Sequence, residues 1–309
     1  METVERVIPV PGLAKPLRVL HLTDTHLLLT DEGERAERNA YAASRHRYFD
    51  DPDGLTQTRR FLRLMELANG TDMLLMTGDI LDFPSRSNLR FLRQALSRLT
   101  VPWLFVPGNH DYTYYDDYAD PEIHRVCREK LGEFCRGGVE VQSLQVGGLT
   151  FLGLFNGRER YDPACEAALR SLPRTGGPVV IAQHIPFACD TLRRDTVAFW
   201  GRDICLGPGA AEGDGSAERV LRLLEQNPRV AAVAAGHLHF SHLDRTGGGL
   251  LQAVTGMSCT GPANLLVFSP AKRGETGSDG RNLICLRWIW RTLFLTGTVL
   301  CGSGWRLSA

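Results

Sequence analysis

Five short apolar segments of this chain each end in residues of the types that bind metal ions. Each segment has the length and composition of a buried β-strand bounded by turn-forming residues. In open α/β sheets, ligands gather beside the carboxyl ends of the strands. The residues at the five ends are Asp24 and His26, Asp79 and Asp82, Asn109 with His110 and Asp111, His184, and His237 with His239. The pattern therefore predicts an α/β fold with a polar site where its strands end.

The segment that ends at Asp79 shows how such a position arises. Residues 73–76 are apolar, and Gly78 lets the backbone turn sharply, so that Asp79 stands at the carboxyl end of a strand. Taken alone, an aspartate in this position is more often a turn residue or a helix cap than a ligand. A single histidine is likewise more often a core residue. Five of the nine histidines nevertheless fall at these strand ends, which favours one shared metal centre.

The number and type of these side chains indicate which ions would bind. In Asp24-Thr25-His26, residues two apart point to the same side of an extended segment, so both side chains can reach one ion. Mixed oxygen and nitrogen ligands without thiolates suit manganese, iron or zinc. A tetrahedral zinc ion takes about four ligands, whereas a larger set suits two ions that share one carboxylate. The candidate ligands are Asp24, His26, Asp79, Asn109, His184, His237 and His239.

The segments between these motifs are predicted to be alternating strands and helices. A first core strand is expected at residues 17–23, and the two glycines at 147 and 148 between apolar runs predict a β-hairpin. Ser216 is the expected cap of the last helix. Apolar residues at helical spacing predict helices at 56–68, 88–99, 164–172 and 216–226.

Two segments are too rich in aromatic and charged residues to be simple connections. Residues 27–54 form either a lid or binding loop over the active edge or a solvated surface loop with partial helix. Residues 112–118 form either a wall of the substrate pocket or a packed surface loop. Stacking of Tyr41, Tyr48 or Tyr114 on the substrate would favour a nucleotide base.

Composition narrows the class of partner and the compartment. Lysine plus arginine and aspartate plus glutamate each total 35, and this balance disfavours a nucleic-acid binder. The eight cysteines include no CxxC pair, which is typical of reduced thiols. The chain starts without the pattern of a signal peptide, and its most apolar stretch, 283–301, contains Arg287 and Arg291. We therefore expect a cytoplasmic protein without a membrane partner.

The ordered set D-x-H, G-D-x-x-D, G-N-H-D, H and G-H-x-H, from Asp24 to His239, resembles the calcineurin-like metallophosphoesterase superfamily. This resemblance implies a four-layer αββα sandwich with a dinuclear metal site at the carboxyl ends of the strands. It places the metallophosphoesterase domain at residues 1–270, and we expect residues 271–309 to add strands or a tail to the same domain.

The resemblance also implies a role for each motif residue. His110 would protonate the leaving oxygen or stabilise the phosphorane, and Asp82, or as a second possibility Asp111, would orient it. A water bridging two divalent ions (Mn, Fe or Zn) would attack phosphorus. The implied first set of ligands is Asp24, His26, Asp79 and His239, and the second is Asp79, Asn109, His184 and His237, with Asp79 bridging.

Differences between this chain and the motifs of other branches of the superfamily indicate which branch it resembles most. Protein Ser/Thr phosphatases of the superfamily carry G-D-x-x-D-R-G and G-N-H-E, whereas Phe83 follows Asp82 here and Asp111 replaces the glutamate. The chain is more similar to the bacterial branch that contains class III cyclic nucleotide phosphodiesterases, although residues 27–54 are longer than that branch's connection. We therefore expect a hydrolase of a small phosphomono- or diester, such as a nucleotide or cyclic nucleotide. The alternatives are a nuclease or a non-catalytic metal-binding scaffold.

Overall fold

The computed structural model describes residues 1–50, 54–114, 120–207 and 214–272. The chain divides into two units, Met1–Thr276 and Gly277–Ala309. All helices and strands of the described residues belong to the first unit. The expected strands or tail at 271–309 fall outside the described residues from 273 onward, so their membership of the same domain stays a prediction.

The first sheet contains the strands that deliver the first three motifs. β2, β3 and β4 run parallel, β11 is antiparallel to β2, and β1 pairs parallel with β11. β1 was not expected from the sequence, because two prolines interrupt its pattern and its partner lies at the far end of the described chain. In spatial order the strands are β1 (Thr3–Pro11), β11 (Ala263–Ala271), β2 (Leu17–Leu22), β3 (Met73–Thr77) and β4 (Trp103–Val106).

The second sheet delivers the last two motifs. β6, β7, β8 and β10 run parallel, while the edge strands β5 and β9 are antiparallel to their neighbours. The hairpin between β5 and β6 turns at Gly147 and Gly148, both with positive φ, as predicted. In spatial order the strands are β5 (Val141–Val146), β6 (Leu149–Leu154), β7 (Val179–Ala182), β8 (Val230–Ala235), β10 (Leu251–Val254) and β9 (His242–Arg245).

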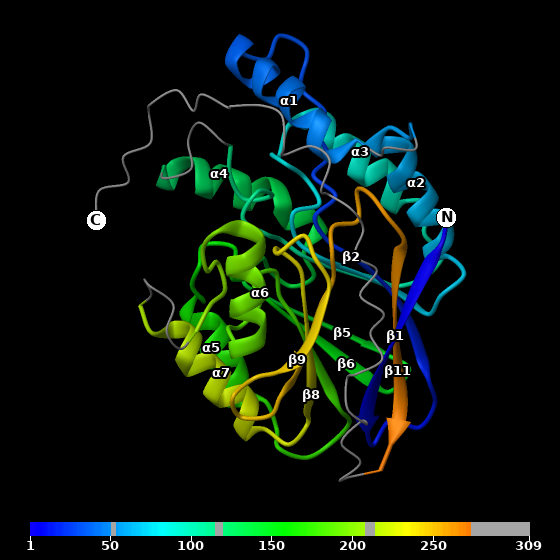
Figure 1. Ribbon diagram of the computed structural model, residues 1–309, viewed down its shortest axis with the longest axis vertical. Coiled ribbons are helices and arrows are strands. Elements are labelled where there is room, and N and C mark those ends of the chain that lie inside the picture. The colour runs from blue at the N-terminus through cyan, green and yellow to red at the C-terminus, as the bar shows by residue number, and fades with distance from the viewer. Residues whose placement is uncertain (51–53, 115–119, 208–213, 273–309) are drawn as a thin grey trace. The chain divides into compact units, whose positions relative to one another are not determined.

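Helices cover the outer face of each sheet. α2 (Gln57–Ala68) and α3 (Arg86–Leu96) pack on the first sheet, and α5 (Pro163–Ser171) and α7 (Ser216–Gln226) on the second (Figure 1). Each of these helices overlaps a predicted one. The cap of α7 is Gly215 and not Ser216, because the Ser216 hydroxyl instead accepts a hydrogen bond from the backbone of Tyr161.

Three buried apolar clusters separate four layers. The first joins Phe61 and Leu64 of α2 to Leu74 of β3. The second lies between the sheets, where Leu75 and Phe151 are both fully buried. The third joins β7 and β8 to α5 and α7. This is the four-layer αββα sandwich that the motif resemblance implied.

Three further helices lie in segments where the sequence pattern did not clearly predict a helix. They are α1 (Ala36–Phe49), α4 (Pro121–Leu131), which continues into a 3-10 turn at Gly132–Phe134, and α6 (Asp190–Trp200). The signal for α4 was present, since Asp120 caps the helix and Pro121 occupies its first turn. Among the described residues, no helix is both long and apolar enough to cross a bilayer.

Candidate metal centre

Backbone hydrogen bonds draw the loops that follow the strands into one cluster. The amides of Asp24 and His26 donate to the carbonyls of Gly78 and Asp79, so the loops after β2 and β3 continue the pairing of their strands. In the second sheet, the amide of Gly236 donates to His184, which joins the loops after β7 and β8. The sequence-predicted strand ends therefore converge at one edge of the sandwich.

The backbone is strained at most of the candidate ligands. Six non-glycine residues in the described part of the chain have positive φ, and five of them are candidate ligands. Such a conformation costs about 1–3 kcal/mol per residue and is found where surrounding structure enforces it, often at functional sites. The five, with their φ angles, are Asp24 (52°), His26 (44°), Asp79 (51°), His237 (71°) and His239 (62°).

Two glycines allow the loops to approach closely. Gly78 has φ +88°, and a Cβ there would lie 2.5 Å from Nδ1 of His184. A Cβ on Gly108 would collide with Oδ1 of Asp79 and lie 2.8 Å from Cδ2 of His184. Only glycine fits at these positions, because the ligand side chains of both sheets occupy the space.

Two groups of side chains could each hold a metal ion. In the first, Nε2 of His239 lies 3.4 Å from Oδ1 of Asp24 and 3.2 Å from Nε2 of His26. In the second, Nε2 of His184 lies 3.2 Å from Oδ2 of Asp79 and 3.3 Å from Nδ1 of His237. These two groups contain six of the seven candidate ligands.

Asp79 lies between the two groups. Its Oδ2 is 3.9 Å from Nε2 of His26 as well as 3.2 Å from Nε2 of His184, and its Oδ1 accepts a 2.9 Å hydrogen bond from the amide of His110. A third group of possible ligands, Asp79 with His26 and His110, also includes this carboxylate. Asp79 is thus placed where a shared carboxylate would stand.

Two buried side-chain oxygens without hydrogen-bond partners indicate whether cations fit this cluster. Oδ1 of Asp24 and Oδ1 of Asn109 are buried and accept no hydrogen bond from any described residue. A buried polar atom without a partner costs roughly 1–3 kcal/mol. A divalent cation bound by these oxygens would remove that cost, so the donor set fits the metals that the motif resemblance implies.

Hydrogen bonds at the far nitrogens orient two of the imidazoles. Nδ1 of His184 donates to the carbonyl of Thr77 at 2.7 Å, and Nδ1 of His26 lies 2.7 Å from Oδ1 of Asp82. In each ring, Nε2 is therefore the nitrogen that faces the cluster. This is the arrangement by which neighbouring groups fix the tautomer of a metal-binding histidine.

The cluster strongly shifts the protonation of its members. Burial opposes ionisation of Asp24, but His239, whose Nε2 lies 3.4 Å from Oδ1 of Asp24, outweighs burial and lowers the pKa of Asp24 to about 2. Burial also opposes protonation of His184, but the charge of Asp79 prevails and raises the pKa of His184 to about 9. Burial, followed by the charge of His184, lowers the pKa of His237 to about 3. The site therefore combines ionised carboxylates, a cationic His184 and a neutral His237.

Of the three residues expected to be catalytic, Asp82 and Asp111 have different partners. Oδ1 of Asp82 lies 3.1 Å from Nδ1 of His110, and the charges of Asp79 and Asp82 raise the pKa of His110 although burial opposes this. The Asp111 carboxylate accepts hydrogen bonds from the amides of Leu81 (2.7 Å) and Gly108 (2.8 Å). Asp82 thus lies beside His110, whereas Asp111 ties together the loops after β3 and β4.

Sequence reasoning missed three side chains that contact this cluster. Phe49 of α1 stacks on the ring of His26, with centroids 4.2 Å apart. Arg45, also on α1, places Nη2 2.7 Å from Oδ1 of Asp82. Trp200, at the end of α6, meets the edge of the His239 ring at 5.3 Å. The only signal for Arg45 and Phe49 was the unusual composition of residues 27–54, and Trp200 had none.

The two aromatic segments have different surroundings. α1 contacts the cluster, which favours the binding-loop reading of residues 27–54. Tyr114 is buried and its hydroxyl donates to the carbonyl of Pro84, while Tyr48 is 52% exposed and contacts Arg47. Of residues 112–118, the described ones therefore belong to a packed loop, and residues 115–118 lie outside the description.

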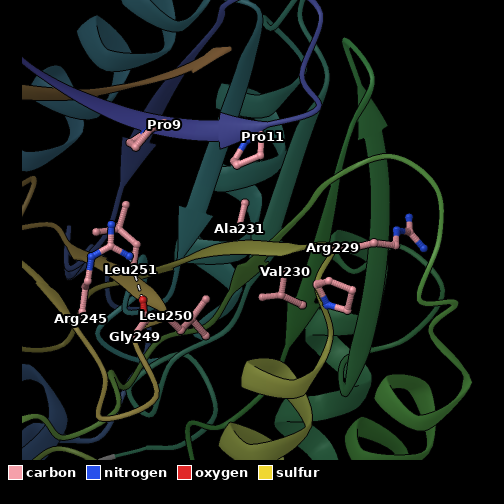
Figure 2. A pocket seen from close by; sticks show the side chains of 10 residues that line it. Pro9, Pro11, Arg229, Val230, Ala231, Arg245, Gly249, Leu250 and Leu251 are labelled. Carbon is pink, nitrogen blue, oxygen red and sulfur yellow. Dashed lines mark hydrogen bonds between the residues drawn. The ribbon is translucent and has the colours of Figure 1, made fainter. Parts of the chain in front are cut away.

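A surface cavity of about 230 Å³ lies away from this cluster (Figure 2). Its lining includes Pro9 and Pro11 of β1 and Val230 and Ala231 at the start of β8. His237 follows the opposite end of β8. The cavity is therefore not the site that the strand-end motifs form.

The chain is similar in sequence or fold to several known proteins. A 3′,5′-cyclic-nucleotide phosphodiesterase of Nostoc sp. is 25% identical over 228 residues, which are 72% of this chain and 72% of that protein. The purple acid phosphatase PPD1 from yellow lupin (Lupinus luteus) seeds has a TM-score of 0.51 and 14% identity over 86% of this chain. This chain spans 48% of the lupin structure, and the match supports the fold alone. A dimetal phosphatase from Danio rerio has a TM-score of 0.45 and 13% identity, and the match covers 80% of this chain and 89% of that one.

The family assignment rests on a match that includes every strand-end motif. The model of the family described as "Calcineurin-like phosphoesterase" matches residues 17–241, a range that contains all five motifs from Asp24 to His239. Two groups of aspartate and histidine ligands lie where these motifs meet. The chain therefore belongs to the calcineurin-like phosphoesterase family and is a metal-dependent phosphoester hydrolase.

Proposed function

We propose that the protein hydrolyses a small phosphodiester, of which a cyclic nucleotide is the leading example, at a centre of two divalent ions that share Asp79. The observation that carries this proposal is the position of Asp79 between two ligand groups, with His110 beside it. The relative from Nostoc is a 3′,5′-cyclic-nucleotide phosphodiesterase, which supports a diester.

The proposed ligands follow the two groups. One ion would be held by Asp24, His26, Asp79 and His239. The other would be held by Asp79, Asn109, His184 and His237. The unsatisfied oxygens of Asp24 and Asn109, one in each set, support this division.

The chemistry that the ions supply when bound is neutralisation of the phosphate oxygens and acidification of a water. The chain's own residues then have two tasks. Buried Asp24 and Asp79 remain ionised and so counter the charge of the cations. His110, whose raised pKa keeps a proton available, would donate it to the leaving oxygen while Asp82 holds the ring in place.

The test uses the purified 309-residue chain loaded in turn with Mn, Fe or Zn. We expect about two ions per chain by elemental analysis, and faster hydrolysis of bis(p-nitrophenyl) phosphate and cyclic AMP than of p-nitrophenyl phosphate. A single-stranded DNA fragment tests the nuclease alternative. A protein that holds two ions but cleaves none of these compounds would contradict the proposal and favour the scaffold alternative.

A further inference from the structure

The last turn of α6 exposes an unusual amount of apolar surface. Val197, Phe199 and Trp200 are 44%, 58% and 41% exposed, and they are three of the six exposed large apolar side chains in the described part of the chain. α6 ends immediately afterwards at Gly201, which has φ +74°. An exposed group of this kind usually marks a binding surface.

Trp200 is fixed to the loop that carries two candidate ligands. Its indole Nε1 donates a 3.0 Å hydrogen bond to the carbonyl of Leu238, which lies between His237 and His239 in the sequence. Its ring meets the His239 ring at a centroid distance of 5.3 Å and an angle of 72°. The orientation of the indole is therefore set by the metal-ligand loop itself.

Two phenylalanines extend this surface away from the cluster. The Phe199 ring lies 5.3 Å from that of Trp200 and 5.3 Å from that of Phe240. Phe240 in turn packs against a buried cluster that includes Leu192 and Leu238. We call Phe199, Trp200 and Phe240 the aromatic platform: Phe199 and Trp200 are exposed, and Phe240 joins them to the buried cluster.

We propose that the aromatic platform stacks the nucleobase of a nucleoside phosphodiester whose phosphate binds at the candidate metal centre. This inference rests on the proposed function and specifies its substrate class. The platform adjoins the centre through the contact of Trp200 with His239, and one ribose separates a base from its phosphorus. Aromatic side chains stack on any base with about 1–3 kcal/mol, since every base has a π-face.

Other occupants fit the platform less well. It comprises three side chains, whereas a stable protein interface engages about 20–30 residues on each side. A substrate held at the neighbouring centre would meet the platform without further contacts. Binding energy from its non-reacting nucleoside would then contribute to catalysis.

The experiment compares two diesters with the same leaving group. They are the p-nitrophenyl ester of thymidine 5′-phosphate and methyl p-nitrophenyl phosphate. The wild-type chain should have the higher kcat/KM on the nucleoside ester. Trp200→Ala should reduce the ratio of the two kcat/KM values by at least about fivefold, and Trp200→Phe should restore most of it. Phe199→Ala, at a more exposed position, should reduce the ratio less. Val7→Ala, which removes another exposed apolar side chain on β1, serves as the control.

A second readout does not depend on turnover. The affinities of thymidine 5′-monophosphate and methyl phosphate are measured by calorimetry, and Trp200→Ala should weaken only the former. Metal content and melting temperature report whether each variant is folded.

Two outcomes would overturn the inference: no preference for the nucleoside ester in the wild type, or a Trp200→Ala ratio unchanged from wild type because both esters lose activity equally or not at all. If the metal-loaded wild type cleaves neither ester, the proposed function fails, and the inference fails with it.

Discussion

The imidazole of His26 lies flat against the phenyl ring of Phe49, with centroids 4.2 Å apart and planes 9° from parallel. One turn earlier on α1, Arg45 contacts Asp82 and also lies over the Phe49 ring at 4.6 Å. The helix within the long insertion is therefore part of the surroundings of the metal centre.

Arg45→Ala should weaken metal binding or turnover by about 10- to 100-fold, the usual effect of losing a residue that supports a ligand. Oδ1 of Asp82 is contacted by Arg45, His26 and His110 at 2.7, 2.7 and 3.1 Å, so removing the guanidinium alters the carboxylate that orients both rings. Metal affinity and kcat check this. Arg45→Lys should retain part of the function, and the matched control is Arg47→Ala on the same helix. Equal effects of the two alanine variants would contradict the role given to Arg45.

His110→Ala should retain both ions but lose about 10²- to 10⁴-fold in kcat, the usual contribution of general acid–base catalysis. His110 belongs to neither of the two proposed ligand sets, and its Nδ1 lies 3.1 Å from Asp82. Elemental analysis and steady-state kinetics are measured on the same preparation. His46→Ala, an exposed histidine paired with Asp50, is the control. Wild-type turnover in His110→Ala would rule out its role as the acid.

Gly108→Ala should abolish metal binding and lower the melting temperature. The added Cβ collides with Asp79 and comes within 2.8 Å of His184, and neither buried ligand has room to move. Gly132→Ala is the control, because a Cβ there meets nothing within 4 Å and its φ of −55° suits alanine. Thermal unfolding and metal content distinguish the two. A Gly108→Ala protein that binds metal like wild type would show that the loops are looser than described.

Metal affinity should rise about tenfold per pH unit between roughly pH 6 and 8. In the metal-free protein, the charge of Asp79 outweighs burial and raises the pKa of His184 to about 9, so this imidazole is protonated below that pH. A metal ion must displace the proton, so acid weakens binding. His237, with its pKa lowered to about 3, is already neutral in this range. Titration calorimetry in buffers of different ionisation enthalpy would count the released proton. Affinity that stays constant over this range would contradict the prediction.

The strand-end residues could be predicted because their pattern is local. Each apolar run defines a strand, and parallel strands bring their carboxyl ends together, so Asp24, Asp79 and His184 could be expected at one edge. The choice between Asp82 and Asp111 could not be made in this way. Both follow a strand closely, and only the folded loops show that backbone amides bind the Asp111 carboxylate.

The contributions of α1 and α6 depend on contacts between distant parts of the chain. Phe49 meets His239, with ring centroids 6.1 Å apart, as well as His26. Trp200 meets His239 across 38 intervening residues. No periodic pattern encodes such contacts. The composition of residues 27–54 indicated that the segment was unusual, but it did not indicate which residues face the centre.

Asp24, His26, Asp79 and Asn109 follow strands of the first sheet, whereas His184, His237 and His239 follow strands of the second. Neither sheet alone carries a complete set for either of the two proposed ions. The centre therefore lies between the two sheets. A small movement of one sheet relative to the other would separate the proposed ligands before either sheet unfolded. During gentle denaturation, bound metal should then be lost when the two sheets separate, before any helix or strand is lost.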